Sequence, residues 1–263
     1  MEPQLLHTVS DGIATVVIHH PAKRNAMTAS MWRELPPLLG RLAADPAVRA
    51  LVLTGEGPTF CAGADISSLR EPRESREERG EGPMEPGDDP RSLAVRAEEA
   101  LAAFPKPTLA AVRGHCVGGG CQLAVACDLR FAEEGALFGV TPARLGIVYA
   151  ASSTRRLVSL VGPSTAKYLL FSAELIGTER ALRTGLVDEV LPAGELGGRV
   201  AEFARVLVSR SRLTQAAAKE SASGGADRTA YWTEQARSSG ETAEGVAAFL
   251  ERREPRFDWT VRA

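Results

Sequence analysis

The sequence predicts an α/β protein in which a core of stacked β-β-α units precedes a helical region. Two segments carry this prediction, residues 50–66 and 107–128, because each passes from a β-prone run through a glycine turn toward a helix start. After Thr154 the pattern becomes mostly helical. We therefore expect a core over residues 1–194 and a helical C-terminal region over residues 195–263.

In the first half of the chain, β-branched runs mark the expected strands and one amphipathic stretch marks a helix. We expect a strand at Ile13–His19, a helix at Ala29–Ala44, and strands near Ala50, Thr108, Leu129 and Leu137. In the second half, apolar residues recur at helical spacing, apart from an extended run at residues 187–191. We expect helices at residues 154–160, 164–171, 178–183, 195–209 and 228–251.

A glycine run at Gly118, Gly119 and Gly120 separates a strand from an Ala/Leu/Val-rich helix at residues 121–127. Free N–H groups at a helix start carry partial positive charge, and glycine lets a ligand oxygen approach them. This arrangement suits an anion or an oxyanion. A tight strand-to-helix turn with close backbone packing explains the run equally well. Neither G-x-G-x-x-G after a strand nor a P-loop motif is present.

The second turn lies in the sequence ALVLTGEGPTFCAGADI at residues 50–66. A short apolar strand is followed by turn residues at 55–58, and Asp65 is placed to cap a helix through Ser68 and Leu69. Two helix starts with free N–H groups could converge on one carbonyl oxygen and form an oxyanion hole.

The overall composition and charge limit the classes of protein to which the chain can belong. The net charge of −2 gives no indication of a nucleic-acid or membrane partner. The first residues lack the basic start and apolar core of a secretory signal, and four cysteines without a C-x-x-C pair suggest reduced thiols. We therefore expect a cytoplasmic protein. No His/Cys spacing indicates a metal site.

Residues 71–90 contain almost no apolar side chains and many Glu, Pro and Gly residues. Such a segment cannot build a core. It is either a solvated loop or a lid near the site that follows residues 62–65.

Motifs in order along nearly the whole chain resemble the enoyl-CoA hydratase/isomerase, or crotonase, superfamily. The matching residues are Asn25-Ala26-Met27, Leu53-Thr54-Gly55, residues 60–65, residues 118–124, Cys127-Asp128, Phe138-Gly139, Leu145-Gly146, residues 185–187, residues 249–253 and Phe257. The resemblance implies a crotonase-like β-β-α spiral core and a C-terminal helical trimerisation region. It also implies an acyl-CoA substrate, no separate cofactor, and a homotrimer or a dimer of trimers.

The resemblance also implies roles for individual residues. The N–H groups of Ala64 and Gly119 would form the oxyanion hole. The coenzyme A part of the substrate would lie near Lys23, Arg24, Ala62, Asp65, Ile66 and Gly118.

Two positions depart from the hydratase pattern. A hydratase of this superfamily activates water with two glutamates, and the corresponding positions here are Gln122 and Pro142. One carboxylate takes a proton while the other gives one, so a chain without both is not expected to hydrate by this route.

A run of the form T-P-x-x-L-G-x-x-Y, from Thr141 to Tyr149, resembles the methylmalonyl-CoA decarboxylase branch. The match is partial, since that branch commonly has a different residue at position 64 and a glutamate at position 122. Decarboxylation of a malonyl-type thioester needs an oxyanion hole but no base, and Tyr149 could orient the carboxylate, with Gln122 contacting the substrate. Tyr149 and Gln122 could equally be packing residues.

Two other functions remain open. The chain could be an enoyl-CoA hydratase or isomerase that uses other acid/base groups, or a non-catalytic acyl-CoA binder. His115 could act as an acid and Arg144 could pair with a substrate carboxylate, although each is also explained as a structural or surface residue. Ser152 and Ser153 lack the G-x-S-x-G context of a nucleophile.

Overall fold

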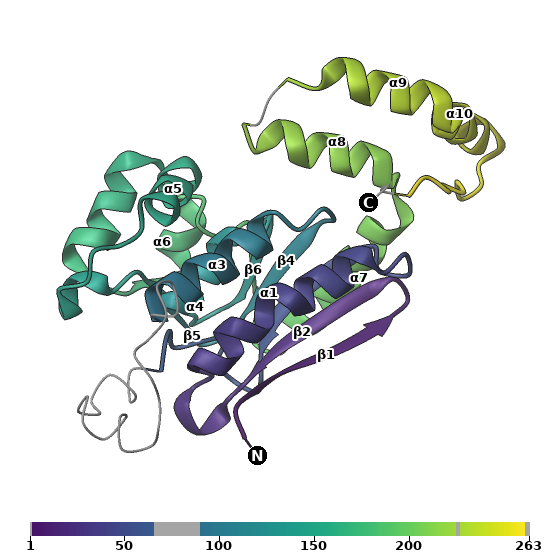
Figure 1. The fold of residues 1–263 in the computed structure, drawn as a ribbon. Helices are drawn as coiled ribbons and strands as arrows, with labels where there is room; N and C mark the ends of the chain where they lie inside the picture. The colour runs from purple at the N-terminus through teal and green to yellow at the C-terminus, as the bar shows by residue number, and fades with distance from the viewer. Residues whose placement is uncertain (1, 66–89, 225–226, 261–263) are drawn as a thin grey trace, which may run out of the picture.

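A six-stranded sheet lies at the centre of the protein (Figure 1). The structure is a computed structural model that describes residues 2–65, 90–224 and 227–260. The strand order is β1-β2-β3-β4-β6-β9. β1 and β2 pair antiparallel, and the other neighbours pair in parallel. The strands are β1 (Gln4–Ser10), β2 (Ile13–His19), β3 (Ala50–Gly55), β4 (Thr108–Val112), β6 (Leu129–Glu133) and β9 (Glu189–Leu191).

The central strands β3 and β4 are buried almost throughout, as their continuous apolar runs predict for parallel strands covered on both faces. A smaller sheet has the order β5-β7-β8 and contains β5 (His115–Val117), β7 (Leu137–Gly139) and β8 (Ile176–Gly177). Two short 3₁₀ helices are η1 (Pro21–Lys23) and η3 (Pro142–Leu145).

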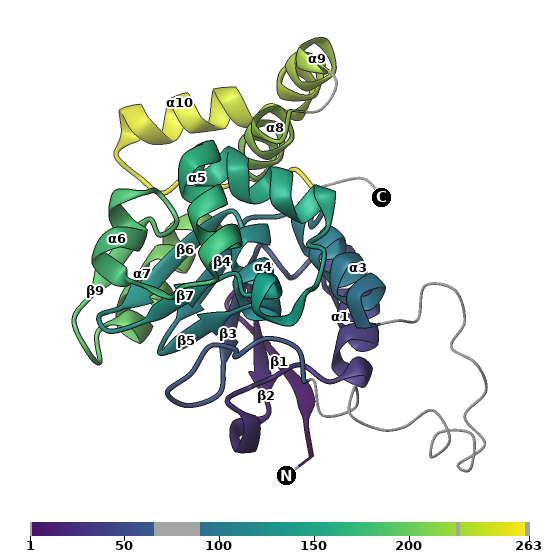
Figure 2. The ribbon, with the colours of Figure 1, turned by 90° about the vertical axis from the view of Figure 1, so that its left-hand side faces the viewer.

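Helices cover both faces of the large sheet (Figure 2). α1 (Ala29–Ala44), α3 (Pro90–Ala102) and α4 (Gly119–Ala126) lie on one side and enclose the main hydrophobic core. α7 (Leu196–Ser209) lies on the other side, where a second buried cluster includes Phe131 and Leu196.

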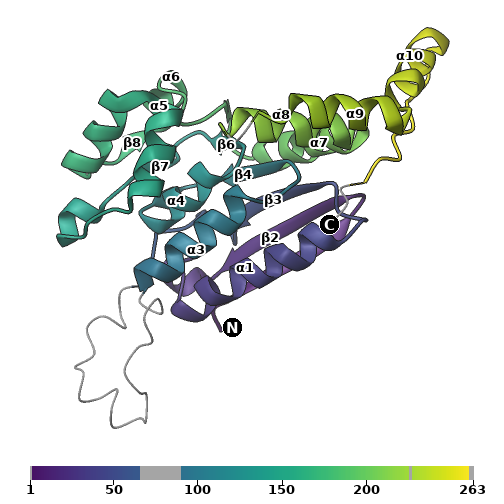
Figure 3. The same cartoon turned by 45° about the horizontal axis from the view of Figure 1, so that its top comes forward.

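The remaining helices lie outside these layers. α5 (Ala151–Ser172) is broken by non-helical backbone at Gly162, and α6 (Thr178–Arg183) follows β8. α8 (Arg212–Ala222), α9 (Thr229–Ser239) and α10 (Glu241–Glu251) extend away from the sheet (Figure 3). Within the described residues, no helix is long and apolar enough to span a membrane.

Most expected elements are confirmed, including the strand Ile13–His19 and the helix Ala29–Ala44. The helix expected over residues 228–251 is wrong as a single element, because Gly240 adopts a left-handed φ of 74° and separates α9 from α10. β1 and α3 were not expected. The division at residue 195 stays a prediction, and α7, although beyond that division, packs on the sheet.

Candidate active site

The glycine turn between β5 and α4 has a geometry that requires glycine. Gly118 has φ 56° and ψ −121°, and its N–H donates to the Gly139 carbonyl at 2.8 Å. The Gln122 N–H donates to the Gly118 carbonyl at 3.0 Å. The Gly119 N–H lies in the first turn of the helix, before the first N–H that forms a helical hydrogen bond. The described residues supply no acceptor for it.

The facing segment, residues 61–65, is held in place by backbone hydrogen bonds on both sides. Cys61 bridges to Cys116 in parallel, and Ala64 bridges to Met27. This second bridge uses the Gly63 carbonyl and the Asp65 N–H, each at 2.8 Å from Met27. In the trans peptide bond between Gly63 and Ala64 the N–H points opposite to the carbonyl, so the Ala64 N–H points away from Met27. Among the described residues it has no acceptor.

These two N–H groups belong to segments that approach closely. A methyl group built on Gly119 would lie 3.6 Å from the Ala64 nitrogen and 2.9 Å from Cζ2 of Trp32. One built on Gly63 would lie 3.5 Å from the Gly119 nitrogen. Glycine at these positions therefore keeps open the space that both N–H groups border.

That space belongs to a cavity of about 730 Å³. Its walls include the apolar side chains of Trp32, Val95, Leu145 and Val148. The structure also brings Ala62, Ala64, Gly118, Gly119, Gln122, Pro142 and Tyr149, all singled out in the sequence, to this one cavity.

Gln122 is buried, and its amide nitrogen is held from behind by Glu98 on α3. Nε2 donates to Glu98 Oε2 at 2.6 Å and to Ser153 Oγ at 3.2 Å. A carboxylate only accepts, so the NH₂ side of the amide must face Glu98. Both amide protons therefore point toward Glu98 and Ser153. Among the described residues nothing bonds to Oε1. Gln122 therefore presents an acceptor oxygen to the cavity.

Glu98 is fully buried, and three donors surround its carboxylate. Ser153 and Gln122 donate to Oε2, and Arg156 pairs with Oε1. Arg156 also pairs with Glu99 at 3.0 Å. A buried carboxylate is stable only with such compensation. Sequence reasoning missed Glu98, although it occupies a position in the stripe of buried residues Ala94, Ala97 and Leu101, where a carboxylate is unusual.

Tyr149 lies between this network and the cavity. Burial raises the pKa of Tyr149 well above its usual value, and the charged forms of Cys121 and Glu98 act in the same direction, against Arg156 and a hydrogen bond with Ser153. The phenol is therefore protonated at neutral pH and can donate one hydrogen bond.

The other residues assigned to coenzyme A binding lie beside this region. Lys23 pairs with Asp65 at 2.8 Å. Arg24 has a left-handed φ of 50°, and its carbonyl accepts the Ala62 N–H at 3.0 Å. Ile66 and the possible lid at residues 71–89 lie outside the described residues.

The described part of the chain contains no group of three or more His, Cys, Asp or Glu side chains placed to hold a metal ion. Its four cysteines are free and buried. Burial raises the pKa of both Cys61 and Cys127 to about 12, so these thiols are not nucleophiles at neutral pH.

Comparison with known proteins decides the family, because the model of the enoyl-CoA hydratase/isomerase family matches residues 8–260. The chain belongs to this family. A crotonyl-CoA hydratase of Syntrophomonas wolfei is 35% identical over 93% of this chain and 94% of the relative. A 2,3-dehydroadipyl-CoA hydratase of Escherichia coli is 31% identical over 97% of this chain and 98% of the relative.

Solved structures of the family share the fold. A crystal structure of an enoyl-CoA hydratase/isomerase family member has a TM-score of 0.87 and 37% identity, and it covers 99% of this chain and 100% of that one. An enoyl-CoA hydratase of Bacillus anthracis has a TM-score of 0.82 and 27% identity, with 96% and 98% covered. The crotonase-like α/β fold expected from the sequence is confirmed. The names of these relatives point to hydration, and none of them refers to a decarboxylase.

Proposed function

We propose that the protein binds an acyl-CoA thioester with its carbonyl oxygen between the N–H groups of Ala64 and Gly119. The support is that both groups border one open space and lack an acceptor within the described residues. A thioester enolate carries negative charge on this oxygen. One well-placed backbone donor contributes about 3–4 kcal/mol to the stabilisation of such a charge.

Decarboxylation of a malonyl-type thioester is the reaction that these side chains favour. The bond between the α-carbon and the carboxylate breaks, carbon dioxide leaves, and the electron pair becomes the enolate. A proton from water then reaches the α-carbon. No enzyme base is needed, which suits a site that carries Gln122 and Pro142. The observation that carries this proposal is the protonated phenol of Tyr149 in the same cavity, because it can donate to the departing carboxylate.

Hydration of an enoyl-CoA is the second candidate, and the names of the relatives favour it. Glu98 lies behind the Gln122 amide, but Ser153, Gln122 and Arg156 occupy its oxygens. Glu98 could therefore act as a base in hydration only after these hydrogen bonds had broken. A non-catalytic acyl-CoA binder is the third reading, and it predicts binding without turnover.

One experiment separates the three. The protein is incubated with malonyl-, methylmalonyl-, ethylmalonyl- and crotonyl-CoA, and the products are identified by mass. Loss of carbon dioxide from one of the first three supports decarboxylation, and addition of water to crotonyl-CoA without loss of carbon dioxide from any of them refutes it. Tight binding of all four by calorimetry without any product identifies a binder.

We also propose that the protein assembles as a homotrimer or a dimer of trimers and resides in the cytoplasm. Large apolar side chains support the assembly, since Val148, Phe171 and Phe249 are 85%, 76% and 82% exposed in the single chain. Sedimentation analysis gives the mass of the assembly.

A further inference from the structure

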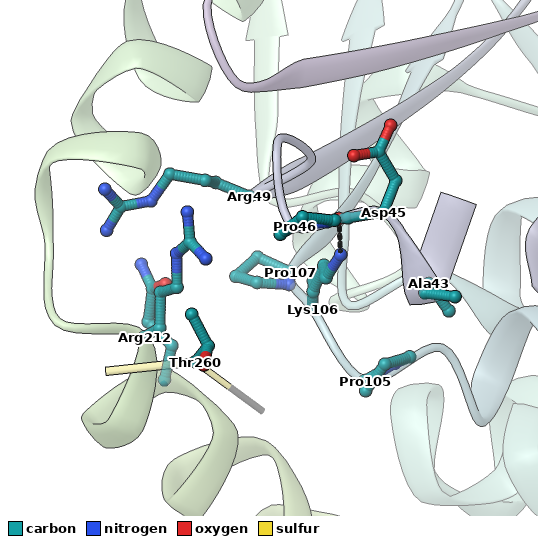
Figure 4. Close-up of a pocket in the computed structure, with 11 residues that line it drawn as sticks. Ala43, Asp45, Pro46, Arg49, Pro105, Lys106, Pro107, Arg212 and Thr260 are labelled. Carbon is teal, nitrogen blue, oxygen red and sulfur yellow. Dashed lines mark hydrogen bonds between the residues drawn. The ribbon is translucent and has the colours of Figure 1, made fainter. Parts of the chain in front are cut away.

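A second cavity, of about 200 Å³, lies where the C-terminal helices meet the core. It is lined by Arg49 before β3, Lys106 before β4, and Arg212 at the start of α8 (Figure 4). We call it the basic cavity. The strands β3 and β4 begin here, whereas the two oxyanion-hole segments follow their far ends. Six residues of strand separate the two regions by about 17 Å, so the basic cavity is distinct from the acyl-CoA site.

Its arginines carry donors that the described residues leave without acceptors. The Nε atoms of both Arg49 and Arg212 are buried and have no hydrogen-bond partner. Arg49 uses Nη2 to donate to the Arg210 carbonyl at 3.1 Å. For the Arg212 side chain the described residues provide no hydrogen bond and no ion pair. A buried, unpaired donor is costly, and a guanidinium has five of them.

Lys106 adds a third cation that is only 8% exposed. Its Nζ donates to the carbonyls of Leu42 at 3.1 Å and Asp45 at 2.7 Å, which leaves one proton of the ammonium group. Burial lowers the pKa of Lys106 to about 8, and Arg212 adds to this effect against Asp45. Burial also lowers the pKa of both arginines. For all three side chains the effect of burial outweighs the attraction of the nearby carboxylates.

Three carboxylates lie near enough to act on these cations, and one of them, Asp45, also lines the cavity, but their hydrogen bonds are directed elsewhere. Asp45 accepts the Ala47 N–H at 2.8 Å. Glu241 accepts the Ser211 hydroxyl and, at 3.2 Å, the Trp259 N–H. Asp258 is exposed. Within the described residues, none of them forms an ion pair with Arg49 or Arg212.

We propose that the basic cavity is a binding site for a phosphate group, held by the guanidinium groups of Arg49 and Arg212 and the ammonium group of Lys106. Planar guanidinium forks match phosphate oxygens in pairs, and three cations balance a dianion better than a monoanion. The volume far exceeds the 10–15 Å³ or so that a single water needs, so a phosphate group and its remaining waters can enter.

The bound group would join two parts of the fold. Arg49 and Lys106 belong to the core, and Arg212 belongs to α8. α8 is already tied to the core by Lys219, which donates to the Lys106 carbonyl at 2.9 Å and to Asp128 at 2.8 Å. Phosphate binding adds a second tie at the other end of this helix and therefore stabilises the native state against unfolding.

The test is calorimetric titration of the full chain with inorganic phosphate in a phosphate-free buffer, alongside a melting curve at each phosphate concentration. We expect one saturable site per chain and a rise of melting temperature that follows the same saturation. Sodium chloride at equal ionic strength is the control, because phosphate also stabilises proteins without binding. A melting temperature that rises linearly, with no heat of binding, overturns the proposal.

Arg212→Gln should weaken phosphate binding at least about tenfold, since it removes charged donors. Arg183→Gln on α6 is the control, because it makes the same charge change at a side chain that is 68% exposed. This variant should bind phosphate as the wild type does. Equal weakening in both variants overturns the proposal. If circular dichroism shows that Arg212→Gln is unfolded, Arg49→Gln takes its place with the same expected result. Adenosine monophosphate that competes with phosphate extends the site to phosphate esters, and its failure to compete restricts the site to the free ion.

Discussion

Replacing Gly119 by alanine tests the oxyanion hole with a single methyl group. That methyl would lie 2.9 Å from Cζ2 and 3.2 Å from Cη2 of Trp32, and 3.6 Å from the Ala64 nitrogen. It therefore enters the space where the thioester oxygen would lie. Trp32 is 1% exposed and cannot easily move away.

The expected loss follows from these distances. Excluding the oxygen from even one donor removes about 3–4 kcal/mol of transition-state stabilisation, so turnover should fall at least about 100-fold. Crowding against Trp32 should also destabilise the fold by about 1–3 kcal/mol. The assay is kcat/KM on the thioester that the wild type turns over fastest, with melting followed by circular dichroism.

Gly40 provides the matched control, because it lies in α1 and a methyl group there meets nothing within 4 Å. Gly40→Ala should keep full activity and gain up to about 1 kcal/mol of stability, since alanine favours the helix. A folded Gly119→Ala variant with wild-type turnover would show that the oxygen binds elsewhere, and the oxyanion hole assigned to Ala64 and Gly119 would be refuted.

The other predictions concern the cavity wall and the basic cavity. Tyr149→Phe should slow decarboxylation about 10- to 150-fold with little change in melting temperature, because it deletes one hydrogen bond to a charged group; full activity would make Tyr149 a packing residue. Crotonyl-CoA hydration should stay far below the ordinary range of about 1–1000 per second, as quenched time courses can show. Because the folded pKa of Lys106 is about 8 and its usual value is 10.5, the unfolded chain binds more protons between these values, so stability should rise with pH across this window. Urea titrations at pH 8 and pH 10 should show that rise in the wild type and a smaller one in Lys106→Met; an equal rise in both proteins would contradict Lys106 as its source.

Local sequence patterns predicted the parts of the fold that local chemistry determines. The helix Ala29–Ala44 follows from its apolar spacing, and the turn at Gly118 follows from its need for a positive φ. The sequence also indicated Ala64, Gly119 and Tyr149 as neighbours of one site, through family motifs.

Long-range pairings could not be predicted in this way. Glu98 bonds to Gln122, Ser153 and Arg156, which are 24, 55 and 58 residues away, so no local pattern identifies its partners. The same holds for Arg49 and Arg212. They line one cavity although they are far apart in the sequence, so no local pattern predicts that they lie together. α3 was missed although Asp89-Pro90 in the sequence is a typical helix start.

The contact between Gln122 and Glu98 makes the effects of substitutions at these two positions interdependent. Restoring the hydratase glutamate by Gln122→Glu would place a second carboxylate where the amide now lies 2.6 Å from Glu98 Oε2. Two carboxylates so close repel each other, so one of them keeps a proton and its pKa rises. The effect of Gln122→Glu therefore depends on the residue at position 98, and the effects of substitutions at the two positions should be strongly non-additive. Among relatives, residues 98 and 122 are expected to change together.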